Sequence, residues 1–405
     1  MKLKSLHLEN FRANALLHLT LGTRLTLLMG VNGSGKTSIL DSLAIGLGAV
    51  PTRLPGVAGI TFKKRGDIRQ QDNRLAPYTR IRLETTDGLR WDRLQRRDQS
   101  RATAKALPSR IGTALLDRQI DEFILGPLNQ GQPFDLPVFA FYGVSRALLD
   151  LPLSRKGFPQ AHQRFEALAD ALNATSRFKA AFVWFYNKEN EETRLQREQR
   201  SFDVTLKELD AVRTAIMRMF PDVSTPQVKL NPLRFTVQQG GETLDIAQLS
   251  DGYKTLLGLV IDLSARMAMA NPHHVDPLTA EAIVMIDEVD LHLHPAWQRR
   301  VIGDLLVTFP KTQFILTTHS PYVVGSINNH LKRHRIQALS IAPEDIRNLF
   351  PLDPAEVAAY ALTQEGAETL IDPRHGLIDD RLLDQFSAMT DQYEAMRDIE
   401  WDQTH

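Results

Sequence analysis

The sequence predicts an α/β protein whose parallel sheet carries a phosphate-binding loop, with a small antiparallel β lobe and a short helical insertion attached. Three observations support this fold class. A glycine-rich segment near the N-terminus stands between an apolar run and a helical pattern, the strand–loop–helix order of a P-loop. Two short, mostly apolar runs in the second half have the composition of buried parallel strands. A charged segment of helical periodicity separates these two regions.

Composition sets the broad class of the protein. The chain has 405 residues, 48 Lys and Arg against 48 Asp and Glu, and no cysteine. The lack of cysteine excludes disulfides, zinc ribbons and thiolate chemistry. No apolar run approaches the roughly 18 residues that span a membrane, and the first residues show no signal-peptide core. We therefore expect a soluble, cytoplasmic protein that does not contact membranes.

The order of patterns along the chain predicts four segments. Residues 1–140 would hold the first part of a nucleotide-binding unit, with the P-loop and a basic β lobe. Residues 141–225 would form the helical insertion. Residues 226–342 would complete the nucleotide-binding unit, and residues 343–405 would form an acidic, helical tail.

In the first half, alternating and continuous apolar patterns predict strands at 2–9 and 24–29, which we expect to share one sheet. A helix should follow over 36–47 and end at Gly46 and Gly48. A hairpin is predicted for 79–85 and 89–93, because Asp87-Gly88 is a good turn pair.

In the second half the elements alternate again. Helical periodicity marks the stretches 111–125, 165–220 and 253–270, the second of which suggests a helical hairpin. Strand patterns mark 136–143, 226–247 with a turn at Gly240-Gly241, 282–286 and 313–318. The hairpin at 165–220 is too short to be the long coiled-coil arm of a chromosome-maintenance protein.

The clearest motif is Gly30-Val-Asn-Gly-Ser-Gly-Lys36-Thr37, which satisfies the P-loop pattern in full and in the required context. Its glycines let backbone N–H groups point at phosphate oxygens, and the helix N-terminus adds a positive dipole end. Lys36 should reach the β- and γ-phosphates of ATP, and the Thr37 hydroxyl should ligate Mg²⁺. The expected nucleotide contacts are Gly30, Asn32, Gly33, Ser34, Gly35, Lys36, Thr37 and Ser38.

Two acidic residues and a histidine follow the predicted parallel strands. Asp287 and Glu288 end the strand at 282–286, at the sheet edge where α/β proteins place ligands. We expect Asp287 to hold the Mg²⁺ shell and Glu288 to act as general base toward the attacking water. His319 ends the next strand and has the chemistry to contact the γ-phosphate. These residues predict ATP hydrolysis, with Glu288, His319 and Lys36 as catalytic groups.

A second phosphate-binding element precedes the helix at 253–270. Leu249-Ser-Asp-Gly-Tyr253 resembles the ABC-type signature. The resemblance implies an ABC-ATPase head in which Ser250, Gly252 and the helix N-terminus bind the γ-phosphate held by another protomer. Two chains would then face head to tail around two ATP molecules, so we expect an ATP-dependent homodimer.

Further motifs resemble the RecF/SMC/OLD-like branch of ABC ATPases, which includes stand-alone AAA-family proteins. They are Leu6-His-Leu-Glu-Asn-Phe-Arg12, Asp287-Glu-Val-Asp-Leu-His-Leu-His-Pro295 and Thr317-Thr-His-Ser-Pro321. The resemblance implies that Arg12 lies near the nucleotide. It also implies kinship with the ATPases of Septu-, PARIS- and retron-type anti-phage modules, which work with a separately encoded effector such as a nuclease.

The chain departs from related patterns at several positions. Asp251 and Tyr253 replace the usual signature glycine and glutamine, and His294 stands where transporters carry an aspartate. Glu365 and Glu368 superficially resemble the first motif of a Toprim nuclease, but no strand precedes them and no metal-binding pair follows. His292 and His294 are two ligands at most, so a structural use in the loop is favoured over zinc.

The charge distribution leaves the macromolecular partner open. A basic stretch runs over residues 63–110 and an acidic stretch over 344–402. The region from Arg90 to Arg110 could contact DNA, although a solvated face is the simpler interpretation. We weigh two functions: control of an effector in anti-phage defence, and a RecF-like role in DNA repair with DNA binding as the primary role. The motifs disfavour a transporter ATPase.

Overall fold

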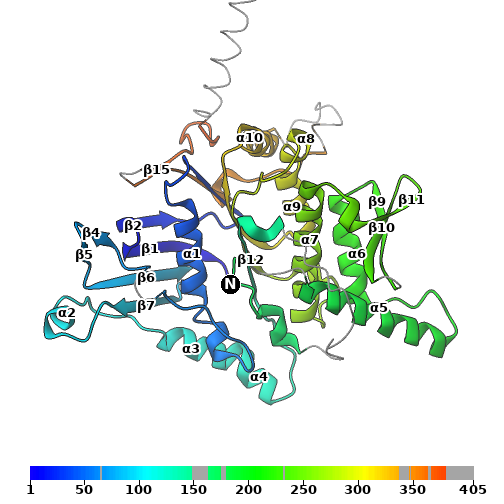
Figure 1. Cartoon of the computed structure of the whole chain (residues 1–405), viewed down its shortest axis with the longest axis horizontal. Helices are drawn as coiled ribbons and strands as arrows, with labels where there is room; N and C mark the ends of the chain where they lie inside the picture. The colour runs from blue at the N-terminus through cyan, green and yellow to red at the C-terminus, as the bar shows by residue number, and fades with distance from the viewer. Residues whose placement is uncertain are drawn as a thin grey trace, which may run out of the picture.

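The computed structural model describes residues 1–63, 66–147, 163–174, 179–230, 233–336, 346, 348–363 and 366–379. It confirms the predicted fold class. A mostly parallel sheet forms the centre, an antiparallel sheet flanks one side of α1 (Lys36–Leu47), and helices with a small third sheet lie on the other side of the molecule (Figure 1).

The central sheet has six strands in the order β15-β14-β3-β13-β12-β8. Their bounds are β3 Leu25–Met29, β8 Val138–Tyr142, β12 Ala282–Ile286, β13 Thr312–Thr318, β14 Val357–Leu362 and β15 Ala367–Thr369. All neighbours pair in parallel except β15, which runs antiparallel to β14. Every residue of β3, β8, β12 and β13 is buried, as the continuous apolar runs predicted.

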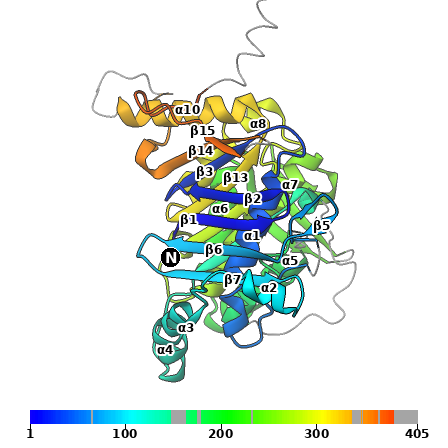
Figure 2. The same cartoon turned by 90° about the vertical axis from the view of Figure 1, so that its left-hand side faces the viewer.

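The second sheet is antiparallel, in the order β2-β1-β6-β7. Its strands are β1 Leu3–Phe11, β2 Asn14–Thr20, β6 Tyr78–Thr85 and β7 Arg90–Arg96, seen side by side in Figure 2. The hairpin prediction is confirmed, but the strand expected at 2–9 does not share a sheet with β3. Its alternating burial explains this, since one face packs inward and the other meets solvent.

Helix α1 lies between these two sheets and is held closely by the antiparallel one. The Trp91 indole N–H donates to the Gly46 carbonyl at 3.0 Å. A Cβ on Gly46 would lie 2.6 Å from Leu83 Cδ1, so the glycine allows this close approach. Gly48 caps the helix as predicted, whereas Gly46 is a packing residue inside it.

The helical insertion is confirmed over its described part. It consists of α5 Lys179–Gln199 and α6 Lys207–Met219, joined by an ion pair between Arg213 and Glu192 at 2.8 Å. A three-stranded sheet follows, with β9 Val223–Lys229, β10 Arg234–Gln239 and β11 Glu242–Asp245. Helix α7 (Asp251–Ala270) packs against α5 and α6 and connects the insertion to the central sheet.

Shorter elements complete the fold. They are β4 Gln70–Gln71, β5 Arg74–Leu75, α2 Arg101–Lys105, α3 Ala114–Ile120, a π-helical turn Asp121–Leu125, α4 Gly126–Asn129, α8 Pro295–Gln298, α9 Val301–Thr308 and α10 Pro321–Arg335. Helices α3 and α4 project below the antiparallel sheet in Figures 1 and 2. Within the part of the chain given above, no helix is both long and apolar enough to cross a membrane.

The predicted helical tail at 343–405 is wrong over its described part. Residues 357–362 form β14, which joins the central sheet beside β3, and residues 367–369 form β15. The pairing partner of β14 lies more than 300 residues earlier in the chain, so local patterns do not reveal it. The remaining part of the prediction, residues 380–405, lies outside the described residues.

Candidate nucleotide site

The loop between β3 and α1 has the backbone geometry of a phosphate cradle. Gly33 and Gly35 have φ values of 83° and 95°, which favour glycine, and a Cβ on either would meet nothing within 4 Å. A Cβ on Gly30 would instead lie 2.7 Å from the Leu362 carbonyl oxygen. Glycine is therefore required at three positions of the motif, and Asn32 lies exposed at the turn.

Lys36 begins α1, and its side chain turns back into the loop. Its ammonium donates to the carbonyl oxygens of Gly30 at 2.8 Å and Val31 at 3.2 Å. Burial lowers the pKa of Lys36 from its ordinary value, and the carboxylates of Glu288 and Asp287 offset this only in part. The cation is thus partly desolvated inside the cradle, where an anionic group would be attracted strongly.

A hydrogen bond joins the P-loop helix to the end of β12. The Thr37 hydroxyl donates to Asp287 Oδ2 at 2.6 Å, although 250 residues separate the two in sequence. Asp287 is only 1% exposed. Hydroxyl and carboxylate oxygens are the donors that Mg²⁺ prefers, so this pair fits the predicted ion.

Thr317 fixes the turn that carries the two acidic residues. Its hydroxyl donates to Asp287 Oδ1 at 2.6 Å and accepts the Glu288 backbone N–H at 2.6 Å. Glu288 has φ of 48°, a conformation that costs a non-glycine residue roughly 1–3 kcal/mol. Thr317 belongs to the Thr-Thr-His motif, but this role was not predicted from the sequence. The available signal was a hydroxyl near the end of a buried strand.

Two buried polar atoms at this edge have no hydrogen-bond partner within the part of the chain that is described. They are His319 Nε2 and Ser34 Oγ. The register of β13 on β3 pairs Thr318 with Met29, which brings His319 beside the start of the P-loop. Buried polar groups are normally satisfied, so these two atoms suit a site that is completed by a ligand.

The signature segment contacts the loop that follows β12. A Cβ on Gly252 would lie 2.2 Å from the His292 carbonyl oxygen. Close packing therefore requires glycine here, apart from the phosphate contact predicted for this residue. Tyr253 packs on Phe220 and Trp297, with ring centroids 4.9 and 5.4 Å away. Ser250 precedes α7, is exposed, and makes no side-chain capping bond. The nucleotide contacts of Ser250 and Gly252 stay predictions.

Arg12 lies over the first turns of α1. Its guanidinium contacts Asp41 at 2.6 Å, Asp67 at 2.9 Å and the Ser38 hydroxyl at 3.4 Å. This places it near the P-loop helix, where two carboxylates already hold it. Direct contact of Arg12 or Ser38 with a nucleotide stays a prediction.

Several basic residues of the stretch proposed to contact DNA make contacts within the chain instead. Arg93 turns inward to the carbonyls of Ile45 and Ile60, while Arg90 pairs with Glu84 and Arg97 with Asp98. Arg90 and Arg97 are exposed but pair with acids; the other exposed basic residues of this stretch are Arg96, Arg101, Lys105 and Arg110. The basic face is therefore smaller than the residue count indicated.

The loop after β12 gives His294 the structural use that was favoured over zinc. The His294 side chain caps α8 by accepting the Ala296 N–H at 3.3 Å. His292 adopts φ of 62° in the preceding turn. Of the two glutamates considered as a nuclease motif, Glu368 lies in β15 and Glu365 lies outside the described residues. The expectation that no strand precedes them is wrong, because β14 ends at Leu362.

Comparisons with known proteins identify a family and several similar proteins. The family model described as "AAA domain, putative AbiEii toxin, Type IV TA system" matches residues 25–325. Over 390 residues the chain is 27% identical to the Retron Ec83 probable ATPase of Escherichia coli, covering 81% of this chain and 70% of that protein. A stretch of 76 residues is 46% identical to the Septu protein PtuA of Bacillus mycoides (strain KBAB4), covering 19% of this chain and 10% of that protein. The solved SMC head domain from Thermotoga maritima aligns at 16% identity with a TM-score of 0.40, over 91% of this chain and 98% of that one.

Proposed function

Because the chain belongs to the AAA-domain family whose model matches residues 25–325, and is a P-loop ATPase, we propose that ATP drives it into a head-to-tail homodimer. That dimer would act in the cytoplasm and control a separate effector in anti-phage defence. The observation that carries the nucleotide part of the proposal is the 2.6 Å bond between Thr37 and Asp287, which joins the phosphate loop to the acidic strand end.

The roles of the chain's own residues follow from this arrangement. Lys36 would neutralise the β- and γ-phosphates from inside the cradle. Thr37 and Asp287 would hold Mg²⁺, which supplies charge neutralisation and orientation of the phosphates when bound. Glu288 would accept the proton of the attacking water, and the free Nε2 of His319 would contact the γ-phosphate. Thr317 would keep the Glu288 backbone in its strained conformation.

The dimer is supported by the exposed start of α7. Ser250 offers a hydroxyl without a capping bond beside the positive end of a 20-residue helix. A γ-phosphate held by the P-loop of a second copy would satisfy both. Two such contacts, related by a two-fold axis, would close the dimer only when ATP is present.

The choice of partner rests on the relatives and on the basic face. Proteins named for a retron and for Septu are similar to this chain, which supports a defence role with a separately encoded effector. The second candidate is a RecF-like repair role that depends on DNA contact. It is supported by the exposed basic residues Arg96, Arg101, Lys105 and Arg110.

Light scattering on the Glu288→Gln variant tests the proposal. This change removes the general base but preserves side-chain size, so ATP with Mg²⁺ should produce a stable dimer and ADP should leave a monomer. A further mass increase with duplex DNA would favour the repair role. A monomer under all conditions would contradict the head-to-tail mechanism.

A further inference from the structure

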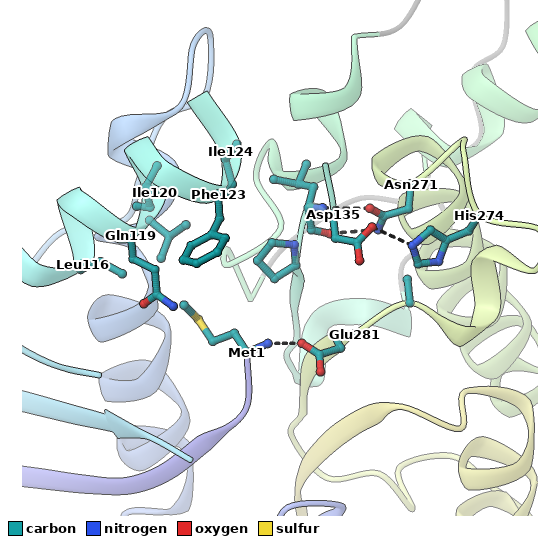
Figure 3. Close-up of a pocket in the computed structure, with 14 residues that line it drawn as sticks. Met1, Leu116, Gln119, Ile120, Phe123, Ile124, Asp135, Asn271, His274 and Glu281 are labelled. Atoms are coloured by element: carbon teal, nitrogen blue, oxygen red, sulfur yellow. Dashed lines mark hydrogen bonds and ion pairs between the residues drawn. The ribbon is translucent and has the colours of Figure 1, made fainter. Parts of the chain in front are cut away.

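A carboxylate and two imidazoles converge where the segment before β8 meets the loop after α7. Asp135 Oδ1 lies 2.8 Å from Nε2 of His273 and 2.8 Å from Nε2 of His274. Figure 3 shows Asp135 and His274 facing each other across this junction. Among the residues that the structure describes, no other group of three or more His, Cys, Asp or Glu side chains converges in this way.

A buried asparagine holds the two segments in register. The side chain of Asn271, which is 1% exposed, accepts the Leu136 N–H at 2.8 Å and donates to the Leu136 carbonyl at 2.9 Å. The His274 N–H also donates to the Asn271 carbonyl at 3.1 Å. The two hydrogen bonds between Asn271 and Leu136 lie within three residues of Asp135 and of both histidines. They hold these side chains in place, which limits the entropy lost when a ligand binds.

The donor set and its geometry suit a transition metal. Two imidazole nitrogens and one carboxylate oxygen lie within 4.8 Å of one another. The two rings stand nearly perpendicular, at 86°, so their Nε2 atoms approach a common point from different directions. Mixed nitrogen and oxygen ligands favour Zn²⁺ over Mg²⁺ or Ca²⁺, which prefer oxygen alone.

We propose that Asp135, His273 and His274 form a Zn²⁺ site with three protein ligands. Such a site leaves a coordination position for water or for a donor atom from another molecule. Asp135 and His274 also line a cavity of about 180 Å³, whose far wall carries Leu116, Ile120 and Phe123. The cavity gives the open position room for a ligand with an apolar part.

This site is separate from the nucleotide site. Asp135 precedes β8 and the histidines follow α7, so the cluster lies at the amino edge of the parallel strands. Asp287 and His319 lie at the carboxyl edge of the same sheet. A zinc ion here would take no part in ATP hydrolysis, and binding of the two metals can be measured independently.

Zinc titration by calorimetry tests the proposal. Protein freed of metal by chelator dialysis is titrated with ZnCl₂ in excess Mg²⁺ without nucleotide, so that hard-ion sites are occupied. One Zn²⁺ per chain should bind, and Asp135→Asn or His274→Gln should each weaken binding at least about ten-fold. Because the chain has no cysteine, thiolates contribute nothing to the signal.

The matched control is His7→Gln. His7 and His18 form another histidine pair, with Nδ1 atoms 3.2 Å apart, outside any three-ligand cluster among the described residues. This variant should bind Zn²⁺ like the wild type. X-ray absorption on the zinc-loaded wild type should detect two imidazoles, which tests the site even if a variant folds poorly. Unchanged affinity in Asp135→Asn, or a zinc shell without imidazole, would overturn the proposal; the cluster would then be two ordinary hydrogen bonds.

Discussion

The N-termini of α1 and α7 differ in how many contacts the chain's own side chains make around them. At α1, Lys36 is buried among loop carbonyls and Thr37 is bonded to Asp287. At α7, Ser250 is exposed and its hydroxyl caps nothing. Both ends carry the same helix dipole, so only the surrounding side chains distinguish them.

The difference indicates that the surroundings of α1 are preorganised and those of α7 are not. The contacts around α1 come from β3, β12 and β13, all within one rigid sheet. The start of α7 has a single ion pair across its first turn, between Lys254 and the 74% exposed Asp251. In the proposed dimer, the half-site at α1 would need only a nucleotide, whereas the half-site at the start of α7 would need a nucleotide held by a second copy.

Lys36→Ala should have the largest effect. Removing the ammonium leaves phosphate charge without its main protein counter-charge, so kcat/KM for ATP should fall by about 10³-fold or more. Steady-state phosphate release measures it. Lys4→Ala is the control, because Lys4 is a surface residue paired with Glu84. A loss below about ten-fold would mean that the α1 half-site is not the catalytic one.

Ser250→Arg should break the second half-site alone. Binding of ATP to the isolated chain should persist, while dimerisation and hydrolysis should be lost by about 10²-fold. The decisive measurement mixes this inactive variant with Lys36→Ala. In a head-to-tail dimer each mixed pair has one intact site, so activity should return, to about a quarter of the wild-type level if pairing is random. If mixing restores nothing, the two half-sites do not meet between chains.

Thr317→Val tests how strongly ATP hydrolysis depends on the hydrogen bonds that hold Asp287 and Glu288 in place. The valine keeps the shape but removes the hydroxyl that bonds the Glu288 N–H and Asp287 Oδ1, which should destabilise folding by about 1–3 kcal/mol. Activity should fall by about ten-fold or more. Thr308→Val is a matched control, since the buried Thr308 hydroxyl has no partner among the described residues. Urea unfolding and phosphate release should separate the two variants.

The smallest effect concerns the insertion that supports α7. Burial raises the pKa of Glu189 on α5 to about 7, above its ordinary value near 4.5. The folded state thus prefers the protonated acid, and its stability should decrease as the pH rises from about 4.5 to about 7. Glu189→Gln should remove this loss, about 1 kcal/mol at pH 8. Urea unfolding at pH 5 and pH 8 measures it, with the exposed Glu198→Gln as control. Parallel pH profiles for Glu189→Gln and wild type would contradict the prediction.

The sequence was most informative where one local pattern determines both conformation and chemistry. The P-loop glycines, the apolar strand ending in Asp287 and Glu288, and the hairpin at Asp87-Gly88 could all be predicted in place. Each depends on residues within about ten positions of one another, where propensity and periodicity act directly.

Features set by distant pairing could not be predicted. β14, with the sequence Val-Ala-Ala-Tyr-Ala-Leu, has the alanine content of a helix, and only its place beside β3 makes it a strand. The bracing role of Thr317 and the cluster at Asp135 likewise require knowing which segments meet. Asp135 and His274 are 139 residues apart, and no periodicity relates them.

The pairing of β14 with β3 also determines when the central sheet can form during translation. β3 is made early, yet its neighbours β13 and β14 are translated nearly 300 or more residues later, and Leu362 closes against Gly30. Until then the strand has two open edges on a growing polypeptide, a state prone to aggregation. The nucleotide site can therefore form only late in translation. A polypeptide interrupted before β14 would contain the P-loop sequence but not a folded ATPase.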